Sequence, residues 1–397
     1  MMSEAAHVPS RTGSGRSSVV LSVLGRLPTL HCAAALAPSV RLITDVRPAH
    51  LATDRVPPSV VESLRPQVVA LTAAVRYSRP PVRAQIAALR ADLFDSLAAR
   101  RLGDCDVLDC WSSSSLKTMQ RGRERGAYLV LNRGSTHMLH QRGVLVDEYA
   151  RWGIRGSLPA SCTIERELQE YEQADLIVVP SAQAAETFVQ HGVAAKRIAV
   201  NVFGVDLDRF APVSLQALER QSEFTLVYVG GDAIQKGLPD ALEGWMRAGQ
   251  PGRFVAVSSA PRWLKQRYRT DSVEFPGRVR DLGRLLSTAT AFVFPSLQEG
   301  HARVLLEALA SGVPIIATRE SGACDFPASP AVTIVPVRNP DEIARAITNV
   351  RSTGDMQELR VAARRIAVGF TWERYVSEHL SFYPAPTHGT SDPGALP

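Results

Sequence analysis

FPSLQEGHARVLLEALASGVPIIAT, residues 294–318, is the stretch that decides the fold. It predicts a strand that ends at Phe294, a glycine-containing loop, a helix from about Arg303 that stops at Gly312, and a second strand from Ile315. Apolar strands that alternate with helices in this way are typical of a parallel sheet with both faces covered.

The same alternation runs through the rest of the chain, more clearly in the second half than in the first. In the second half we expect strands at 225–229, 254–257, 273–275, 291–294, 315–318 and 332–335, and helices at 239–248, 261–269, 279–287, 303–311, 340–350 and 356–368. In the first half we expect strands at 19–24, 40–44, 68–71, 128–131, 176–179 and 198–202, and helices at 163–171 and 182–191. The pattern predicts an α/β protein with two Rossmann-like, doubly wound parallel-sheet domains facing a cleft.

A chain of 397 residues is long enough for two such domains. Both ends are rich in Ser, Thr, Gly and Pro and lack a periodic apolar pattern, which predicts disordered tails. The predicted parts are a tail at 1–17, a first domain at 18–207, a polar linker at 208–223, a second domain at 224–369, a last helix at 370–383 and a tail at 384–397.

The start of the helix near Arg303 is suited to an anion. Free backbone N–H groups and the helix dipole favour a diphosphate at such a place. The amides concerned are those of Gly300, His301, Ala302 and Arg303. Glu299 lies in the loop before the helix and Glu307 lies within it among apolar residues, where a carboxylate needs hydrogen-bond donors such as sugar hydroxyls.

Two plainer interpretations fit the same residues. Ser296 and Glu299 have the spacing of an S-x-x-E capping box. Glu307 could be an ordinary exposed helix residue. Taken alone, two glutamates eight positions apart do not decide between these interpretations and a binding site.

The run P-S-x-x-E-G-x-x-x-V-x-L-E-A-x-A-x-G-x-P-I-I-A-T, residues 295–318, resembles the signature of the retaining GT-B glycosyltransferases of family 4, also called glycosyl transferases group 1. The resemblance implies the GT-B fold, with an acceptor-side first domain, a nucleotide-sugar-binding second domain and a last helix that crosses back to the first. It also implies that Glu299 and Glu307 form the family's Glu-x7-Glu pair, with Ser296 and Val304 in the same donor-binding segment.

Two segments upstream are similar to further parts of the family pattern. NVFGVDLDRFAP at 201–212 resembles the end of the first domain, and FTLVYVGGDAIQKGLPDAL at 224–242 resembles the first loop of the donor domain. There the resemblance implies that Gly230 and Gly231 let the backbone approach the donor. It implies that Lys236 faces the diphosphate and stabilises the leaving group.

The chain departs from the family at Gly231, where an arginine is frequent, so one phosphate-facing charge is missing. Arg303 and Arg278 are candidates to replace it. The segment at 275–296 resembles the strand, turn and helix that cradle the nucleobase. The base-reading backbone would be that of Gly277, Arg278 and Val279.

In the first domain, residues 106–153 and 165–193 are similar to bacterial members of the family. His137 follows the strand expected at 128–131, where the family often has an active-site histidine near the donor sugar. The resemblance therefore implies a catalytic role for His137. A surface histidine, or a weak H-x-x-H metal pair with His140, are the alternatives.

The net charge is +6 and the pI about 9.2. Acidic residues are interspersed throughout, so we expect no nucleic-acid partner. The densest basic stretch is 76–101, where apolar residues stand at helical spacing between six arginines. It is either an ordinary solvated helix face or a surface that touches anionic lipid or a lipid-linked acceptor.

The composition favours a cytoplasmic protein, with peripheral membrane contact as an option. The five cysteines are odd in number and form no CxxC pair, which suits reduced thiols. No run of 18 apolar residues is present, and the first basic residue precedes a Gly/Ser stretch, so we expect neither a membrane span nor a secretory leader.

Competing enzyme classes lack their motifs. No G-x-G-x-x-G, G-K-[ST] or G-x-S-x-G run occurs, which argues against a dehydrogenase, a P-loop enzyme and a serine hydrolase. Two D-x-D strings, at 104–106 and 206–208, are explained by turns, so we expect no metal and no other cofactor. A nucleotide-sugar epimerase or hydrolase, or a non-catalytic sugar-nucleotide-binding subunit, remains as an alternative.

The sequence therefore predicts a hexosyltransferase. The resemblance implies transfer from a UDP- or GDP-type sugar to a glycan, glycolipid or small-molecule acceptor, with retention of configuration, in cell-surface polysaccharide or glycolipid synthesis. The predicted catalytic residues are Glu299, Lys236 and His137.

Overall fold

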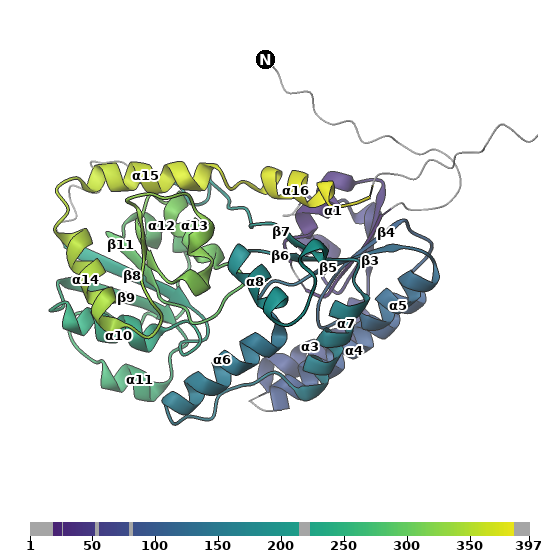
Figure 1. Ribbon diagram of the computed structural model, residues 1–397, viewed down its shortest axis with the longest axis horizontal. Coiled ribbons are helices and arrows are strands. Elements are labelled where there is room, and N and C mark those ends of the chain that lie inside the picture. Colours follow the sequence, from purple (N-terminus) through teal and green to yellow (C-terminus); the bar gives the residue numbers. More distant parts are fainter. Residues whose placement is uncertain (1–18, 26, 52–54, 79–81, 214–222, 385–397) are drawn as a thin grey trace, which may run out of the picture.

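The computed structural model describes residues 19–25, 27–51, 55–78, 82–213 and 223–384. Over these ranges the chain forms two parallel β-sheets, each surrounded by helices, which lie side by side (Figure 1). The predicted fold class, two doubly wound parallel-sheet domains, is confirmed.

The first sheet has the strand order β3-β2-β1-β4-β5-β6-β7, all parallel. Its strands are β1 (Val19–Val23), β2 (Val40–Thr44), β3 (Val61–Ser63), β4 (Val107–Trp111), β5 (Tyr128–Asn132), β6 (Leu176–Val179) and β7 (Ile198–Val200). The helices around it are α1 (Leu30–Leu36), α2 (Pro48–Leu51), α3 (Arg65–Tyr77), α4 (Val82–Arg101), α5 (Leu116–Glu124), α6 (Met138–Arg151), α7 (Ser161–Gln173) and α8 (Ala182–Gln190).

The second sheet has the order β10-β9-β8-β11-β12-β13, again all parallel. Its strands are β8 (Phe224–Gly230), β9 (Gly252–Ser258), β10 (Val273–Glu274), β11 (Ala291–Phe294), β12 (Ile315–Ala317) and β13 (Val332–Ile334). The helices that follow or separate them are α10 (Leu238–Arg247), α11 (Arg262–Arg267), α12 (Leu282–Ser287), α13 (Arg303–Ala310), α14 (Pro340–Arg351), α15 (Met356–Val368) and α16 (Trp372–Ser381).

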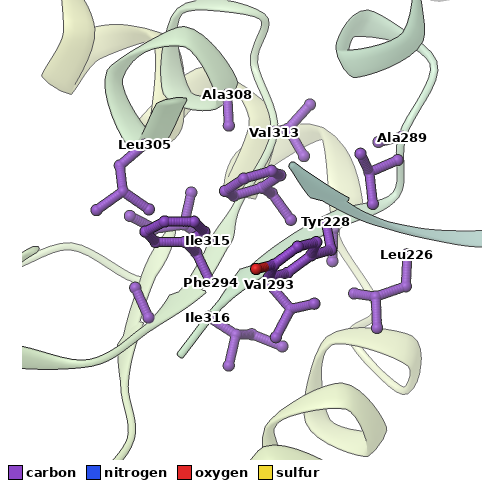
Figure 2. Close-up of a cluster of buried hydrophobic side chains, with 14 of the residues drawn as sticks. Leu226, Tyr228, Ala289, Val293, Phe294, Leu305, Ala308, Val313, Ile315 and Ile316 are labelled. Carbon is purple, nitrogen blue, oxygen red and sulfur yellow. The ribbon is translucent and has the colours of Figure 1, made fainter. Parts of the chain in front are cut away.

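The central strands of the second sheet are apolar on both faces, because helices cover both. All four residues of β11 are buried. Figure 2 shows Phe294 and Val293 of this strand among Tyr228, Leu305 and Ile316, which come from neighbouring strands and from α13. This packing fixes where β11 ends, and therefore where the loop that carries Glu299 begins.

One predicted strand is wrong. Residues 68–71 belong to helix α3, which has a proline in its first turn. Val68 is the fully buried residue of that helix, and its apolar neighbours recur at helical rather than alternating positions. A proline at a helix start is a normal helix feature, and it outweighed the local β propensity.

Strand β4 was missed because a carboxylate interrupts its apolar run. Asp109 is completely buried in the middle of the strand. It accepts hydrogen bonds from Asn132 at 2.6 Å, from His379 Nε2 at 2.6 Å and from the Tyr383 hydroxyl at 2.7 Å. A buried charge is tolerated when it is paired in this way, but the partners come from distant parts of the chain.

Two of those partners belong to the C-terminal segment, which crosses back to the first domain. Helix α16 lies beside α1, at the top of Figure 1. The ring of Trp372 stacks on His31, and Tyr375 is part of the hydrophobic core of the first domain. Residues from the C-terminal end of the chain thus complete the hydrophobic core beside the first sheet.

Some expectations fall outside this description. The tails predicted at 1–17 and, apart from Pro384, at 384–397, and residues 214–222 of the predicted linker, lie outside the described residues. Among the helices that are described, none has both the length and the apolar character needed to cross a membrane.

Candidate active site

The strand order of the second sheet reverses between β8 and β11. In open α/β sheets, ligands bind at the carboxyl ends of the strands on either side of such a switch point. Strand β8 leads into the loop that carries Lys236, and β11 leads into the loop that carries Glu299. The topology therefore brings these two residues to the same edge of the sheet.

Lys236 and Glu299 form an ion pair between Nζ and Oε1. Each side chain is 17% exposed, so the pair is largely shielded from water but still reachable from the cleft. Each charge neutralises the other, and both sit where a ligand at the switch point would lie.

The two loops are joined by further hydrogen bonds. The amide of Leu297 donates to the Gln235 carbonyl at 3.0 Å, and Gln235 Nε2 donates to the Gln298 side-chain oxygen at 2.7 Å. The Ser296 hydroxyl donates to the same Gln235 carbonyl at 3.3 Å. The geometry of the Lys236–Glu299 pair is thus set by the backbone on both sides.

Helix α13 begins directly after this loop, with Ala302 as its N-terminal capping residue. The prediction of a free amide at Ala302 is wrong, because that N–H donates to the Ser321 carbonyl at 2.9 Å. Gly300, His301 and Arg303 remain as the candidate amides for an anion at this helix start.

Glu307 lies one turn into α13 and is half-buried. Burial raises the pKa of its carboxyl, and the guanidinium groups of Arg303 and Arg209 oppose that rise. Arg209 belongs to the segment predicted as a linker, and sequence reasoning did not single it out. A carboxylate and two cations therefore gather near the helix start.

The first domain closes over this site at backbone distance. A Cβ atom placed on Gly300 would lie 2.3 Å from the carbonyl oxygen of Gly134 and 2.8 Å from Pro180 Cγ. Beside this contact, Gln298 Nε2 donates to the hydroxyls of Ser135 at 2.5 Å and Thr136 at 2.7 Å. Gln298 is fully buried, so it acts as a bridge between the domains.

Ion pairs reinforce the closed arrangement around this contact. They are Arg151 with Asp240 at 3.0 Å, Arg338 with Glu148 at 2.7 Å and Arg319 with Glu186 at 2.6 Å. Glu148 and Asp240 are almost fully buried, so the acid of each of the first two pairs is shielded from water, whereas Arg151 and Arg338 remain partly exposed.

Comparison with known proteins fits this geometry. Residues 223–352 match the family described as glycosyl transferases group 1. The chain is 28% identical over 333 residues to a D-inositol 3-phosphate glycosyltransferase of Geodermatophilus obscurus, which covers 76% of this chain and 71% of the relative. It is 29% identical over 220 residues to a GDP-mannose-dependent phosphatidylinositol dimannoside mannosyltransferase of Mycobacterium tuberculosis, covering 52% of this chain and 57% of that protein.

Solved structures share the fold over nearly the whole chain. Alr3699/HepE of Anabaena, in complex with UDP-glucose, matches with a TM-score of 0.64 at 15% identity, covering 91% of this chain and 99% of that one. Sucrose-phosphate synthase from Thermosynechococcus elongatus matches with a TM-score of 0.64 at 18% identity. The match covers 92% of this chain and 98% of that structure. The chain is a glycosyltransferase of the GT-B type.

Two predicted donor-binding residues of the glycosyltransferase point their side chains elsewhere. The Ser296 hydroxyl is buried and also donates to the Gln298 carbonyl at 3.2 Å. Helix α13 begins seven residues beyond it, so the capping-box alternative does not apply. The His301 ring is buried against Phe203 and Phe326, and burial together with Arg374 lowers its pKa to about 3. His301 can therefore contribute only its backbone.

The glycines after β8 differ from each other. A Cβ on Gly230 would lie 2.5 Å from the Tyr228 hydroxyl, so this glycine is explained by the enzyme's own sheet. Around Gly231 an added Cβ would meet no described heavy atom within 4 Å. The backbone at Gly231 therefore has open space around it, and the approach of both glycines to the donor stays a prediction.

The predicted base-reading segment lies at the end of β10. Gly277 has a φ of +74°, Arg278 is exposed and Val279 is half-buried. Val304, by contrast, packs against the core of the second domain. The roles assigned to these four residues stay predictions.

His137 is placed in the interior of the first domain. Its ring is 3% exposed, stacks on His191 at 4.2 Å and touches Phe188 and Tyr171. Burial, followed by the charges of neighbouring histidines and Arg133, lowers its pKa to about 4, so it is neutral at physiological pH. A catalytic role for His137 stays a prediction. Its burial does not favour that role, because a buried ring has little access to a donor sugar.

Within the described residues, no group of three or more His, Cys, Asp or Glu side chains is arranged to hold a metal ion. A hollow of 580 Å³ lies in the second domain between the segment 327–330 and helix α15. None of its lining residues belongs to the predicted site.

Replacing Gly300 by alanine should force the domains apart, because the new methyl group would overlap the Gly134 carbonyl. We expect the radius of gyration from small-angle X-ray scattering to increase and sugar transfer to fall. Gly143→Ala is the matched control, since its Cβ meets nothing within 4 Å in helix α6. An unchanged radius in Gly300→Ala would show that this contact does not limit closure.

Proposed function

We propose that this glycosyltransferase moves a hexose from a UDP- or GDP-type sugar to a hydroxyl acceptor with retention of configuration, in the synthesis of cell-surface polysaccharide or glycolipid. The observation that carries the proposal is the Lys236–Glu299 pair at the β8/β11 switch point, directly before helix α13. The similar proteins support both donor types, since one is named for GDP-mannose and another was solved with UDP-glucose.

In this proposal the diphosphate lies at the start of α13. The amides of Gly300 and Arg303 and the helix dipole favour its negative charge. Lys236 turns from Glu299 to the phosphate next to the sugar and stabilises it as it leaves. Because Lys236 supplies this charge, we propose that no metal ion is required.

The two glutamates bind hydroxyl groups. Glu299, released from Lys236, accepts hydrogen bonds from the donor hexose, and Glu307 accepts them from the ribose. The bond from the sugar's anomeric carbon to the phosphate oxygen breaks, and a bond to the acceptor oxygen forms on the same face. The acceptor's proton passes to the leaving phosphate, so no second carboxylate is needed as a nucleophile.

The donor site is tested by thermal shift with UDP, GDP and ADP and their sugar conjugates, with and without EDTA. One nucleotide should raise the midpoint of unfolding, since a ligand at 100 times its Kd adds about 2.7 kcal/mol to stability. We expect the shift to survive EDTA and to be lost in Glu307→Ala but kept in Glu358→Ala, an exposed helix glutamate. A shift that needs a divalent cation would contradict metal-independent binding, and no shift would favour a non-catalytic subunit.

The chemistry is tested on the ion pair itself. Lys236→Ala should cost about 2–4 kcal/mol of transition-state stabilisation, which is a loss of about 30- to 900-fold in kcat. Glu299→Ala should abolish transfer while the unfolding midpoint stays close to that of the wild type. Transfer is measured as sugar incorporated into acceptor against nucleotide released. Release that exceeds incorporation in the wild type would instead indicate a hydrolase, and a changed free sugar nucleotide an epimerase.

We also propose that the enzyme works in the cytoplasm and touches anionic membrane through helices α3 and α4. All five cysteines are unpaired, which suits a reducing compartment. Tyr77 is 80% exposed and Leu89 is 56% exposed, and no acidic residue occurs between 63 and 91. Arg90 and Arg101 are paired with acids, so the exposed charge lies mainly on Arg76, Arg83 and Arg100.

This contact predicts cosedimentation with phosphatidylglycerol vesicles but not with phosphatidylcholine vesicles. Reversing the charge of Arg76 and Arg83 to glutamate should weaken binding at least tenfold, at about 1 kcal/mol for each basic residue at the surface. The same reversal at Arg345 and Arg351, on α14, is the control. Equal loss in both variants would mean that net charge, and not this surface, attracts the vesicles.

A further inference from the structure

The first sheet has a switch point of its own, between β1 and β4. A pocket of about 330 Å³ lies there, close to the lower end of the size range of small-molecule sites. It is lined by Leu24, Leu27, Trp111, Ser112, Ser113, Ser114, Arg133, Gly134 and Ser135. Gly134 is also the residue that contacts Gly300, so the pocket lies beside the donor loop, by which we mean the segment between β11 and α13.

The lining combines apolar side chains with serine hydroxyls. Leu24, Leu27 and Trp111 provide an apolar wall. The Ser113 and Ser135 hydroxyls are engaged with Glu167 and Gln298, respectively. Ser114 is buried and its hydroxyl donates to the Trp111 carbonyl at 3.5 Å, whereas the half-buried Ser112 carries a hydroxyl that can both donate to and accept from a ligand. Such a lining fits a ring with C–H faces and hydroxyl edges.

Of the lining residues in the part of the chain that the structure describes, Arg133 alone carries a charge. That charge is already neutralised. Its Nε lies 3.1 Å from Glu167 Oε2, and its NH2 group donates to Gln141 at 2.7 Å. Glu167 is fully buried and also accepts from the Tyr171 hydroxyl.

The other acid below the pocket stays protonated near neutral pH. Burial, reinforced by the charge of Glu167, raises the pKa of Glu170 to about 8. The floor of the pocket therefore holds one cation and one anion, with no net charge to attract a phosphate.

Helix α7 also fixes the wall of the pocket. Ser113 has a φ of +75°, a conformation that non-glycine residues rarely adopt. Its amide donates to Glu170 at 2.7 Å, its carbonyl accepts from Arg166 at 3.2 Å, and its hydroxyl donates to Glu167. Three residues of helix α7 thus hold Ser113 in place. Glu167 also pairs with Arg133, so it connects the loop after β4 with the loop after β5.

We propose that this pocket receives the acceptor as an uncharged, hydroxyl-bearing ring, and that Glu167 sets this preference by neutralising Arg133. The proposal rests on the proposed transfer function. It names Glu167 as a specificity-determining residue that acts through Arg133 and Ser113 and does not itself touch the acceptor.

The test uses the full chain, with its donor site filled by the nucleoside diphosphate that gives the largest thermal shift. Binding of glucose, mannose and myo-inositol is compared with that of glucose 6-phosphate, mannose 6-phosphate and inositol 1-phosphate by saturation-transfer difference NMR. At least one neutral ring should bind, at least fivefold more tightly than its phosphorylated partner. A phosphorylated ring that binds as tightly or more tightly would overturn the proposal, and so would the failure of all three neutral rings.

Two variants locate the effect. Ser112→Phe fills the pocket and should abolish binding of the neutral ring, whereas Ser39→Phe, an exposed position before β2, should retain it. Glu167→Gln frees the Arg133 charge and should improve binding of the phosphorylated ring at least tenfold, with no such gain in the exposed neighbour Glu165→Gln.

If Glu167→Gln does not fold, the wild-type comparison and Ser112→Phe still decide the question. Binding that persists in Ser112→Phe would place the ring elsewhere. If no nucleotide shifts the unfolding midpoint, the proposed function fails by that measurement. The NMR comparison without nucleotide then tests the pocket separately.

Discussion

The backbone contact between Gly300 and Gly134 is the constraint on which the site depends. No side chain separates the two loops there, so the carboxyl ends of β11 and β5 approach as closely as two peptide chains can. Gln298 can then reach Ser135 and Thr136, and the donor loop is held against the first domain. The Lys236–Glu299 pair lies next to this contact, so the geometry of the charged residues follows from the geometry of closure.

The two switch points give the halves of the molecule different electrostatic characters. At β8 and β11 the pair of Lys236 and Glu299 remains partly exposed and can exchange partners with a charged ligand. Beside β1 and β4, Arg133 is 12% exposed and is paired with the fully buried Glu167, which further hydrogen bonds hold in place. We therefore propose that the same topology produces one site for a diphosphate and one for a neutral ring, because the hydrogen bonds of Glu167 keep it paired with Arg133.

Sequence reasoning succeeded where local pattern and final structure agree. Each of the six strands expected in the second half overlaps an observed one, and the loops of Lys236 and Glu299 meet as the switch-point argument requires. It failed where distant partners decide: besides Asn132, the partners that make Asp109 acceptable inside β4 are His379 and Tyr383, which come from the other end of the chain. The bridge formed by Gln298 could not be predicted either, since no local pattern shows which side chains meet across two domains.

The crossing of α16 has a consequence for how the protein is made. Tyr375 and the hydrogen bonds to Asp109 belong to the interior of the first domain, yet the residues that supply them are synthesised after the second domain. Domains generally fold from the N-terminus as the chain emerges from the ribosome. Until the second domain has been translated, Asp109 in β4 lacks His379 and Tyr383 and has only the first-domain partner Asn132. The hydrophobic core of the first domain is therefore completed only after the second domain has been synthesised.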